Sequence, residues 1–477
     1  MFVKKRNEYG EITRYKARLV AKGFTQRPGV DFDEIYAPVV RYDSLRLLLA
    51  LATKNGWIPT QIDIKAAFLY GKLKEEIYME LPPGYGNQKG NQKGDEVCLK
   101  LRKSIYGLKQ SPREWYACLT NFLQNRGLQA CPFDPCVFSN IMDITTANEK
   151  VIMAVYVDDI TLYGSNEAIA ALTKQLRDRF NLSEAGKLHY LLGIQISISN
   201  SEISLSQRGY VDKILHRFGM SDCKPQKVPL SPDHGLRKWR EGDEPADQKL
   251  YQQIIGCLIY LVTGTRPDIA YVTMLLSQYA SQPNTKHMGA AKRVLRYLQG
   301  SRDQKLRYTP NQDDNAAVEL VGYADSDFAN DKDDRKSISG YIFCLNGNTI
   351  SWRAKKRGTV ATSTTEAELY AMSFAAKHLS WIKEGLSELG YEAKKATLNG
   401  DNQSTLTLIK SQKINDLTKH VAVTYHHIRN LVLEQNRFSL QYVPSSENLA
   451  DICTKGLARV QYEKLRGVII NEGIMSV

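Results

Sequence analysis

Two adjacent carboxylates at the end of an apolar run are the first residues of this chain whose types and spacing could do chemistry. Asp158 and Asp159 follow Val-Ile-Met-Ala-Val-Tyr-Val at 151–157, whose β-branched and aromatic residues predict a buried strand. Two such charges repel each other and lose hydration, and a hard divalent cation with oxygen ligands is the simplest compensation. The alternative is a solvated turn, where aspartate is common. The flanking strand, however, is too apolar for an exposed edge.

A third carboxylate can join this pair from another strand. Gln-Ile-Asp-Ile at 61–64 alternates polar and apolar residues and carries Asp63. Three carboxylates converging from two strands could hold two Mg²⁺ ions. One ion would activate an attacking 3′-hydroxyl group, and the other would neutralise a triphosphate leaving group. The pattern therefore indicates nucleotidyl transfer.

A second group of acids lies in the C-terminal region, mostly at the ends of predicted elements. Two of them end strands, one opens or enters a helix near the C-terminus, and one lies at the start of a long helix. They are Asp325, Asp401, Asp451 and either Glu366 or Glu368.

Helical geometry separates the two glutamates. The predicted helix 365–389 has an apolar stripe at steps of three and four residues, and this stripe continues onto Glu368 rather than Glu366. We therefore expect Glu368 to face the sheet that carries Asp325. The alternative is a capping box, because Thr365 stands three residues before Glu368.

Composition and charge narrow the class of protein. The 477 residues suggest about three domains. A hydrophobic share of 43% with 24% charged residues excludes a disordered, collagen-like or coiled-coil chain. Lys and Arg number 64 against 51 Asp and Glu, a net charge of +13, which favours a polyanionic partner. A run of about 18 apolar residues is missing, so no membrane span is expected.

Start and stop signals place the elements that must position these acids. A helix is predicted over 44–54, ended by Asn55-Gly56, and a second starts at a capping box formed by Ser111 and Glu114 and ends at Gly127. The remaining predictions are a strand over 60–64, a surface loop over 86–94, a linker over 224–247, helical segments over 251–300 with a break at Arg266-Pro267, three strands over 318–325, 338–345 and 349–353 with a hairpin turn at Asn346-Gly347, and a strand over 438–443.

Seven segments carry a resemblance. They are Tyr-Lys-Ala-Arg-Leu-Val-Ala-Lys-Gly-Phe (15–24), Gln-Ile-Asp-Ile-Lys-Ala-Ala-Phe-Leu-Tyr-Gly (61–71), Ser-Ile-Tyr-Gly-Leu-Lys-Gln-Ser-Pro-Arg-Glu-Trp (104–115), Tyr-Val-Asp-Asp (156–159), Tyr-Leu-Leu-Gly-Ile (190–194), Arg-Phe-Gly-Met (217–220) and Thr-Arg-Pro-Asp-Ile-Ala-Tyr (265–271). In this order they resemble the reverse transcriptase of Ty1/copia-type retrotransposons over nearly the whole chain. The resemblance implies an α+β and α/β protein with a right-hand polymerase of fingers, palm and thumb.

The resemblance also implies roles for individual residues. The metal-binding acids of the polymerase would be Asp63, Asp158 and Asp159. The aromatic ring under the incoming sugar would be Phe68, with a plain core aromatic as the alternative. Residues expected to grip the triphosphate are Lys16, Arg18 and Lys22, with a solvated basic face as the alternative. Residues expected around the templating pair are Tyr106, Gly107, Lys109 and Gln110. Residues expected to guide the primer are Tyr190, Leu191, Leu192, Gly193 and Ile194, with core strand residues as the alternative.

The C-terminal acids lie in a second set of matching motifs. These are Asp-Ser-Asp, Ser-Thr-Thr-Glu-Ala-Glu-Leu, Asp-Asn-Gln-Ser and Leu-Ala-Asp-Ile-Cys-Thr-Lys-Gly. They resemble the ribonuclease H domain that follows the polymerase in the same retrotransposons. The implied chemistry is two-metal hydrolysis of the RNA strand of an RNA–DNA hybrid by Asp325, Glu368, Asp401 and Asp451. The chain departs from the family at 419–422, where Ala422 replaces an acid.

A domain order and a set of partners follow from the resemblance. The expected domains are fingers and palm over 1–223, a linker with a helical thumb or connection over 224–315, a ribonuclease H-like domain over 316–460 and a tail over 461–477. Expected cofactors are two Mg²⁺ ions per active centre, with Mn²⁺ as a substitute. Expected partners are an RNA template, a DNA primer, the RNA–DNA hybrid, deoxynucleoside triphosphates, Gag-type particles and integrase, without a membrane. The expected location is a cytoplasmic retrotransposon particle, with the nucleus as the alternative.

Two other readings of the sequence stay open. The chain begins inside the fingers segment, so an N-terminally truncated copy is expected, and a catalytically inactive nucleic-acid-binding remnant is the main alternative to an active enzyme. A host DNA polymerase or repair nuclease is the third possibility. Template preference, RNA against DNA, would distinguish it.

Overall fold

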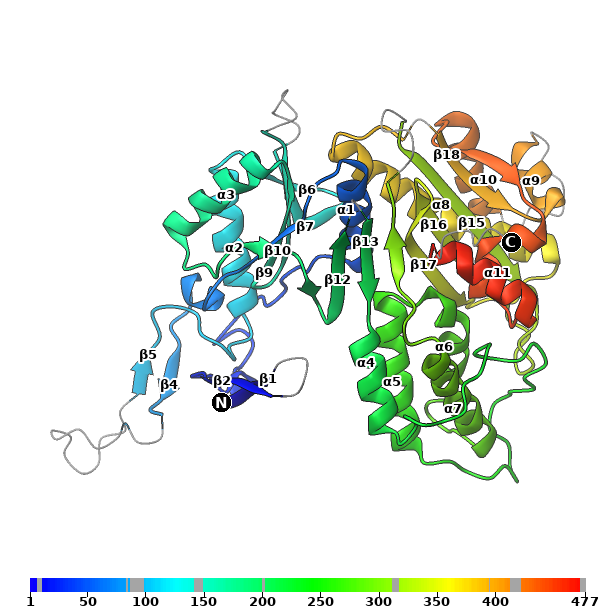
Figure 1. Cartoon of the computed structure of the whole chain (residues 1–477), viewed down its shortest axis with the longest axis horizontal. Coiled ribbons are helices and arrows are strands. Elements are labelled where there is room, and N and C mark those ends of the chain that lie inside the picture. Colours follow the sequence, from blue (N-terminus) through cyan, green and yellow to red (C-terminus); the bar gives the residue numbers. More distant parts are fainter. Residues whose placement is uncertain are drawn as a thin grey trace. The chain divides into compact units, whose positions relative to one another are not determined.

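The computed structural model describes most of the chain as two compact units (Figure 1). Unit 1 comprises Met1–Arg41 and Pro59–Lys187, and unit 2 comprises Tyr42–Ile58 and Leu188–Val477. The described residues are 1–6, 11–82, 85, 98–140, 149–199, 202–310, 317–393, 395–411 and 422–471. The loop expected over 86–94 and residues 419–421 of the departing motif lie outside them.

Unit 1 is built on a six-stranded antiparallel sheet with the strand order β10-β3-β9-β8-β7-β6. The strands are β3 (Thr60–Asp63), β6 (Gln129–Cys131), β7 (Asp134–Ser139), β8 (Val151–Tyr156), β9 (Asp159–Gly164) and β10 (Gly186–Lys187). The expected strand–turn–strand around Asp158 is confirmed, because β8 and β9 pair directly. The first five residues of β8 are buried, as its continuous apolar run predicts.

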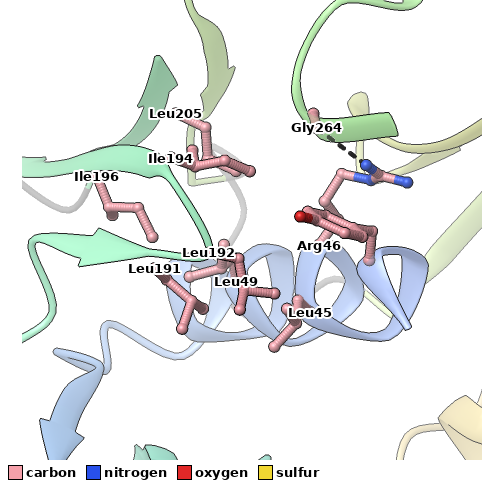
Figure 2. A pocket seen from close by; sticks show the side chains of 10 residues that line it. Leu45, Arg46, Leu49, Leu191, Leu192, Ile194, Ile196, Leu205 and Gly264 are labelled. Carbon is pink, nitrogen blue, oxygen red and sulfur yellow. Dashed lines mark hydrogen bonds between the residues drawn. The ribbon is translucent and has the colours of Figure 1, made fainter. Parts of the chain in front are cut away.

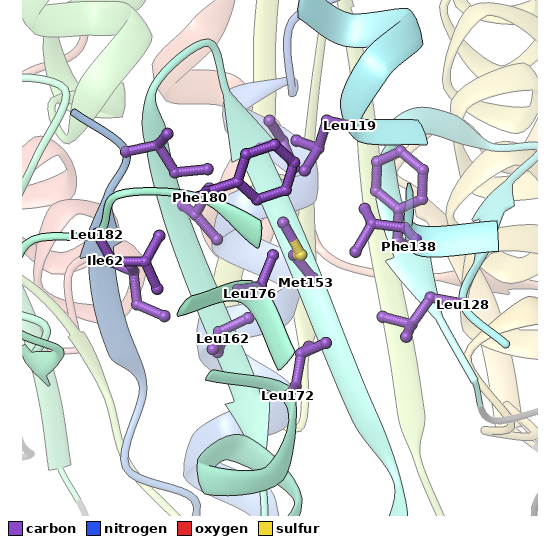
Figure 3. Close-up of a cluster of buried hydrophobic side chains, with 14 of the residues drawn as sticks. Ile62, Leu119, Leu128, Phe138, Met153, Leu162, Leu172, Leu176, Phe180 and Leu182 are labelled. Carbon is purple, nitrogen blue, oxygen red and sulfur yellow. The ribbon is translucent and has the colours of Figure 1, made fainter. Parts of the chain in front are cut away.

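Two helices supply the core of unit 1 (Figure 3). Helix α2 (Ser111–Gln124) contributes Leu119, and helix α3 (Asn166–Arg179) contributes Leu172 and Leu176. These leucines lie against the sheet residues Ile62 and Met153. Ser165 caps α3, because its hydroxyl accepts a hydrogen bond from the Ala168 amide at 3.1 Å. The core therefore fixes the strands that carry the first acids.

The start of α2 corrects one expectation. The Ser111 hydroxyl does not cap the helix; it donates a hydrogen bond to the Ile105 carbonyl at 2.6 Å, and the N-cap residue is Gln110. Ser111 is already the first helical residue, so its side chain stabilises the turn before the helix through the bond to Ile105. The helix also ends at Gln124, three residues before Gly127, which has a left-handed φ of 81°.

Two small antiparallel sheets complete unit 1. They are β1 (Phe2–Arg6) with β2 (Ile12–Ala17), and β4 (Tyr78–Glu80) with β5 (Cys98–Lys100).

Helix α1 (Tyr42–Lys54) belongs to unit 2, although its neighbours in sequence belong to unit 1. The helix begins two residues before the predicted start, and Asn55-Gly56 follows its end, as expected. Its leucine-rich surface is buried nearly all round, which is typical of a helix in the centre of a fold. Arg46 donates hydrogen bonds to the carbonyls of Ile350 at 2.7 Å and Gly264 at 2.9 Å. This buried guanidinium ties α1 to the rest of unit 2.

The remainder of unit 2 contains a four-stranded sheet, a group of helices and a five-stranded sheet. The four-stranded sheet has the order β11 (Tyr190–Leu191), β12 (Ile194–Ser199), β13 (Glu202–Ser206), β14 (Leu306–Tyr308). The helices between them are α4 (Arg208–Arg217), α5 (Gln248–Gly264), α6 (Ala270–Ser277) and α7 (Thr285–Gly300). The predicted helical region and its break are thus confirmed; a 3₁₀ turn, Pro267–Ile269, forms the break.

The five-stranded sheet has the order β17-β16-β15-β18-β19. Its strands are β15 (Glu319–Asp327), β16 (Ile338–Leu345), β17 (Asn348–Lys356), β18 (Lys395–Gly400) and β19 (Ser439–Tyr442). The first three are antiparallel, and β18 and β19 join in parallel. The predicted hairpin turn is confirmed, because Asn346 and Gly347 both have positive φ. The helices of this part are α8 (Thr364–Glu388), α9 (Gln403–Lys410), α10 (Ala422–Arg429) and α11 (Arg459–Ile469).

The mixed α/β content agrees with the expected fold class. The segment predicted as a linker, 224–247, has no regular structure over most of its length, but Leu230 and Leu236 are buried in it. The expected four-part domain division stays a prediction. Among the described helices, none combines the length and apolar composition needed to cross a lipid bilayer.

Candidate active sites

The first acid set, Asp63, Asp158 and Asp159, lies where β3, β8 and β9 meet. The register of β3 and β9 puts Asp63 opposite Asp159, and Asp158 lies in the tight turn between β8 and β9. The Ile64 amide donates a hydrogen bond to the Asp158 carbonyl at 3.2 Å. Opposed residues of antiparallel strands share one face, with Cα atoms about 4.5–5.5 Å apart. The fold therefore brings the backbones of Asp63 and Asp159 opposite each other and Asp158 into the adjoining turn, and all three residues are half-buried.

The turn that carries Asp158 is held in an uncommon conformation. Val157 has a φ of 58°, which is an outlier for a β-branched residue and costs about 1–3 kcal/mol. The buried Trp115 of α2 compensates, because its indole Nε1 donates a hydrogen bond to the Val157 carbonyl at 2.7 Å. A core side chain thus holds the turn that carries Asp158.

Ser183 anchors the other strand of the first acid set. Its hydroxyl accepts a hydrogen bond from the Asp63 amide at 3.0 Å, and its own amide donates to the Asp63 carbonyl at 2.8 Å. The backbone of Asp63 is therefore fixed on both sides, by β9 and by Ser183. Our sequence reasoning assigned no role to Ser183, which lies outside the quoted motifs, or to Trp115, which ends the quoted segment 104–115.

An aromatic and basic surface is built from the segments expected to bind the nucleotide. The rings of Phe68 and Tyr106 meet edge to face at 5.0 Å, and the Arg18 guanidinium lies 4.9 Å from the Tyr106 ring centre. Phe68 is half-buried, so it packs against the core and also keeps exposed ring area. Lys22 is exposed and forms an ion pair with Glu80 at 3.1 Å. Lys16 lies half-buried on β2.

Gly107 lets two backbone segments approach closely. The Ala21 amide donates a hydrogen bond to the Tyr106 carbonyl at 2.8 Å, and Gly107 has a φ of 96°. A Cβ atom on Gly107 would lie 2.2 Å from the Ala21 carbonyl oxygen. Only glycine fits this contact, which explains its place in the motif.

Gln26 is a further residue that the sequence did not single out. Its side-chain oxygen accepts from the Lys109 amide at 2.8 Å, and its side-chain nitrogen donates to the Gln110 side chain at 3.1 Å. Gln110 is fully buried and also donates to the Asp31 carbonyl at 2.8 Å. Gln110 therefore positions the surrounding turn. A direct contact with nucleotide would need this buried amide to move, and its nucleotide role stays a prediction.

The segment expected to guide the primer forms the β11–β12 hairpin in unit 2. Leu191 and Ile194 are buried against α1, where they line a small apolar pocket (Figure 2). Tyr190, in contrast, is 51% exposed. Tyr260 locks the turn, because its hydroxyl donates to the Leu192 carbonyl at 2.7 Å. The two buried side chains fit the core alternative, which leaves Tyr190 and the turn backbone to make any contact with a primer.

The second acid set, Asp325, Glu368, Asp401 and Asp451, lies at the C-terminal ends of β15 and β18, two inner strands of the five-stranded sheet. Asp325 is near the C-terminal end of β15, and Asp401 directly follows β18. Because these neighbouring strands are parallel, the two acids lie at the same end of the sheet. One carboxylate oxygen from each of Asp325, Glu368 and Asp401 lies within 4.8 Å of the others. Asp451 comes from a 3₁₀ helix, Leu449–Cys453. Its carboxylate is linked to Asp325 through Lys455.

The start of α8 decides between the two glutamates. Ser363 caps the helix by accepting from the Glu366 amide at 3.1 Å, and the Glu366 carboxylate accepts from the Thr362 amide at 2.6 Å. Glu368 is left to face the sheet, where it accepts from the Ser326 amide at 3.3 Å. The expected orientation of Glu368 is confirmed. The capping box proposed as the alternative, Thr365 with Glu368, is wrong because Ser363 and Glu366 cap the helix.

Burial and mutual repulsion perturb the second acid set. Burial, followed by the charges of Asp325 and Asp401, holds the pKa of Glu368 well above its ordinary value. Burial and the neighbouring Asp325 raise the pKa of Asp451 to about 8, although Lys455 opposes this. Burial would lower the pKa of Lys455, but Asp325 and Asp451 outweigh it, so the pKa is raised. Such crowded, desolvated carboxylates are a suitable environment for hard divalent cations.

Three groups that our sequence reasoning missed complete the second site. The Thr454 hydroxyl donates a hydrogen bond to Asp325, and the Ser445 hydroxyl donates to Asp401 at 2.5 Å. Lys455 lies 3.0 Å from Asp451 Oδ1 and 3.5 Å from Asp325 Oδ2. A signal for Lys455 was present: it stands four residues after Asp451 in the quoted Leu-Ala-Asp-Ile-Cys-Thr-Lys-Gly motif.

Comparison with known proteins relates the chain to transposon polyproteins. Residues 1–232 match the family described as reverse transcriptase (RNA-dependent DNA polymerase). The chain is 37% identical, over 96% of its length and 34% of the relative, to the retrovirus-related Pol polyprotein from transposon TNT 1-94 of Nicotiana tabacum. It is 37% identical to that from transposon RE1 of Arabidopsis thaliana, over 98% of the chain and 31% of the relative.

A yeast relative and two solved structures extend the comparison. The transposon Ty1-DR6 Gag-Pol polyprotein of Saccharomyces cerevisiae is 29% identical over 93% of the chain and 25% of the relative. The chain thus spans between a quarter and about a third of these relatives. LC11-RNase H1 in complex with an RNA/DNA hybrid aligns with 28% of the chain and 94% of its own, at 13% identity and a TM-score of 0.24. RNase H1 from the archaeon Halobacterium salinarum aligns with 29% and 95%, at 14% identity and a TM-score of 0.21. TM-scores of this size do not establish a common fold.

Proposed function

The chain belongs to the Pol polyproteins of Ty1/copia-type transposons, with residues 1–232 in the reverse transcriptase family, and from this premise we propose that it is an RNA-directed DNA polymerase with an associated ribonuclease for RNA–DNA hybrids. The observation that carries the polymerase half is the register of β3 and β9, which puts Asp63 opposite Asp159 and beside Asp158. The chemistry of the acids suits hard divalent cations such as Mg²⁺, or Mn²⁺ in its place.

In the proposed polymerase centre, the first acid set would hold two Mg²⁺ ions. Bound Mg²⁺ supplies charge neutralisation at the phosphate oxygens and lowers the pKa of the attacking hydroxyl group. The exposed face of Phe68 would lie under the sugar of the incoming nucleotide, and Tyr106 supports it from the side. Arg18 and Lys22, with Lys16, are the nearby cations proposed to orient the triphosphate. The Trp115 hydrogen bond to Val157 would hold the turn of Asp158 in place during the reaction.

In the proposed nuclease centre, the second acid set would hold the metal ions. Asp325, Glu368 and Asp401 already bring three oxygens within 4.8 Å, a spacing that a shared cation can bridge. Thr454 and Ser445 orient two of these carboxylates by hydrogen bonds. The RNA strand of the hybrid is the proposed substrate, recognised by its backbone and A-like shape rather than by sequence.

Template, primer, hybrid and deoxynucleoside triphosphates are the proposed partners, and a right-hand arrangement of fingers, palm and thumb is the proposed architecture. We also propose association with Gag-type particles and integrase, in a cytoplasmic particle. This part rests on kinship with polyproteins whose names join Gag and Pol. Co-sedimentation of the chain with assembled Gag particles would test it, and free sedimentation in their presence would count against it.

Primer extension on poly(rA)/oligo(dT) with the purified chain, with and without Mg²⁺, tests the polymerase. Replacing Asp158 and Asp159 together by Asn should reduce extension by at least about a hundredfold, because the metal-binding charge is lost. The same variant should still degrade a labelled RNA–DNA hybrid. Extension that persists in this variant would refute the polymerase assignment.

A reciprocal variant tests the nuclease. Asp325→Asn should stop hybrid degradation and leave extension intact, since the two acid sets lie on different sheets. Loss of both activities in a folded variant would mean that the centres are not separable. Mg²⁺-independent binding of hybrid without either activity in the unmodified chain would favour a non-catalytic remnant.

A further inference from the structure

Lys455 is the cation that the second acid set already contains. Its Nζ atom lies 3.0 Å from Asp451 Oδ1 and 3.5 Å from Asp325 Oδ2. Both aspartates are almost fully buried, with 2% and 1% of their surfaces exposed. A charged ammonium has three donors and no lone pair, so it can neutralise carboxylates but cannot serve as a metal ligand.

The geometry of Asp451 shows that its contact with Lys455 is ionic. Asp451 Oδ1 is buried and makes no hydrogen bond that meets geometric criteria within the described part of the chain. Its close neighbour is the Lys455 ammonium, which approaches without hydrogen-bonding alignment. A buried carboxylate oxygen without a donor is costly unless a charge compensates it. The surroundings of Asp451 Oδ1 therefore suit a cation, and the Lys455 ammonium is the cation that lies next to this oxygen.

The local fold delivers Lys455 to this place. Asp451 lies in the short 3₁₀ helix Leu449–Cys453, and Lys455 follows Asp451 by four residues, just after this helix. The amides of Thr454 and Lys455 both donate to the Asp451 carbonyl, at 3.1 Å and 3.2 Å. Thr454 donates its hydroxyl to Asp325. One short segment thus supplies an acid, an orienting hydroxyl group and a counter-charge to the same centre.

We propose that Lys455 is a resident counter-ion of the second acid set, which holds the acids together in the absence of metal and competes with divalent cations for Asp451 and Asp325. This inference rests on the proposed nuclease function and adds a regulation of its metal occupancy. A divalent ion near these oxygens would be repelled by the ammonium, which lies 3.0 Å from Asp451 Oδ1 and 3.5 Å from Asp325 Oδ2 and so takes up space beside them. Lys455 therefore sets the Mg²⁺ concentration at which the centre fills.

Metal binding without nucleic acid tests this directly. The full chain carrying Asp158→Asn and Asp159→Asn has lost two of the three acids of the first set, and Mg²⁺ can be titrated into it by calorimetry, with Asp401→Asn identifying the binding that belongs to the second acid set. In this background, Lys455→Met should bind Mg²⁺ about tenfold more tightly than the parent, because a competing charge is removed while the aliphatic stem is kept. Lys455→Arg keeps the charge and should bind close to the parent. Lys464→Met, on the exposed face of α11, is the matched control for loss of a lysine and should change nothing.

The outcomes separate the inference from the proposed function. Mg²⁺ binding that disappears in Asp401→Asn places the ion in the second acid set and supports the proposed nuclease. If that holds but Lys455→Met binds Mg²⁺ equally or less tightly, the counter-ion inference is overturned and the nuclease stands. If the parent shows no Asp401-dependent binding, both are overturned. If Lys455→Met does not fold, as judged by circular dichroism, Lys455→Gln takes its place under the same criteria.

Discussion

Filling the second acid set with Mg²⁺ should release protons, and the number follows from the structure. Burial and the charge of Asp325 raise the pKa of Asp451 to about 8. At about pH 7 the coupled acids of the second set then hold about one proton between them, while Lys455 faces the negative charge that remains. Carboxylates bind metals in the ionised form, so entry of the ion must expel that proton. We expect release of about one proton or more per binding event, drawn from Asp451 and Glu368 together, because the pKa values of both are raised.

Calorimetry in two buffers measures this release. Mg²⁺ is titrated into the Asp158→Asn, Asp159→Asn chain in HEPES and in Tris, whose ionisation enthalpies differ, and the difference in apparent enthalpy gives the protons released. Linkage also predicts that affinity rises about tenfold between about pH 7 and pH 9, as the proton of Asp451 ceases to compete. Asp451→Asn should lower this release at about pH 7, because it removes one of the acids that share the proton.

One result would refute this reasoning. If Mg²⁺ binds in the second acid set but the apparent enthalpy is the same in both buffers at about pH 7, the acids are already ionised. Burial and repulsion would then not govern this centre. The sign for stability follows as well. A carboxyl with a raised folded pKa contributes stability that is full below about pH 4, falls progressively as the pH rises to about 8 and is lost above it, so the metal-free chain should weaken across this range and Mg²⁺ should restore stability at its upper end.

Two further predictions concern the positioning of the polymerase acids and the helices of unit 2. Trp115→Phe leaves the Val157 carbonyl without its donor, so it should cost about 1–3 kcal/mol of stability and reduce primer extension. The control, Tyr116→Phe, removes a more exposed hydrogen bond and should cost under about 0.5 kcal/mol. Equal effects of the two variants in urea unfolding would contradict this account. Burial lowers the pKa of His287 in the folded chain, so this imidazole takes up a proton more readily in the unfolded chain. The contribution of His287 to the free energy of unfolding should therefore be full above about pH 6.5 and fall as the pH drops below it. His287→Gln should flatten that fall in the apparent urea midpoint, while a substitution at the exposed His216 should not, and an unchanged slope in His287→Gln would contradict it.

Local patterns in the sequence were enough to predict most elements. The apolar run at 151–157 became β8 because a strand buried on both faces needs no polar alternation. Asn346-Gly347 became a hairpin turn because both positions require positive φ. The helical stripe that continues onto Glu368 also predicted its orientation correctly. In each case the signal lies within one element.

Signals failed where the decision depended on residues outside the element, either in the preceding turn or far away in the sequence. Ser111 has the sequence of a capping box, yet its hydroxyl bonds to Ile105, because the preceding turn offers a better-placed carbonyl. Helix α1 looks like part of the first domain, yet its Arg46 bonds to the Ile350 carbonyl, some three hundred residues away. Hydrophobic periodicity shows that such a helix is buried, but it does not show against what.

The sequence by itself therefore determined which acids this chain has, on which elements they lie and to which family it belongs. Tertiary structure alone decided that Asp63 stands opposite Asp159 and that Lys455 lies among the acids of the second set. The physical reason is that the periods of strands and helices are local, whereas strand register is set by pairing between segments far apart in the chain. Charge repulsion among buried acids, and the cation that relieves it, arise only once those segments have met.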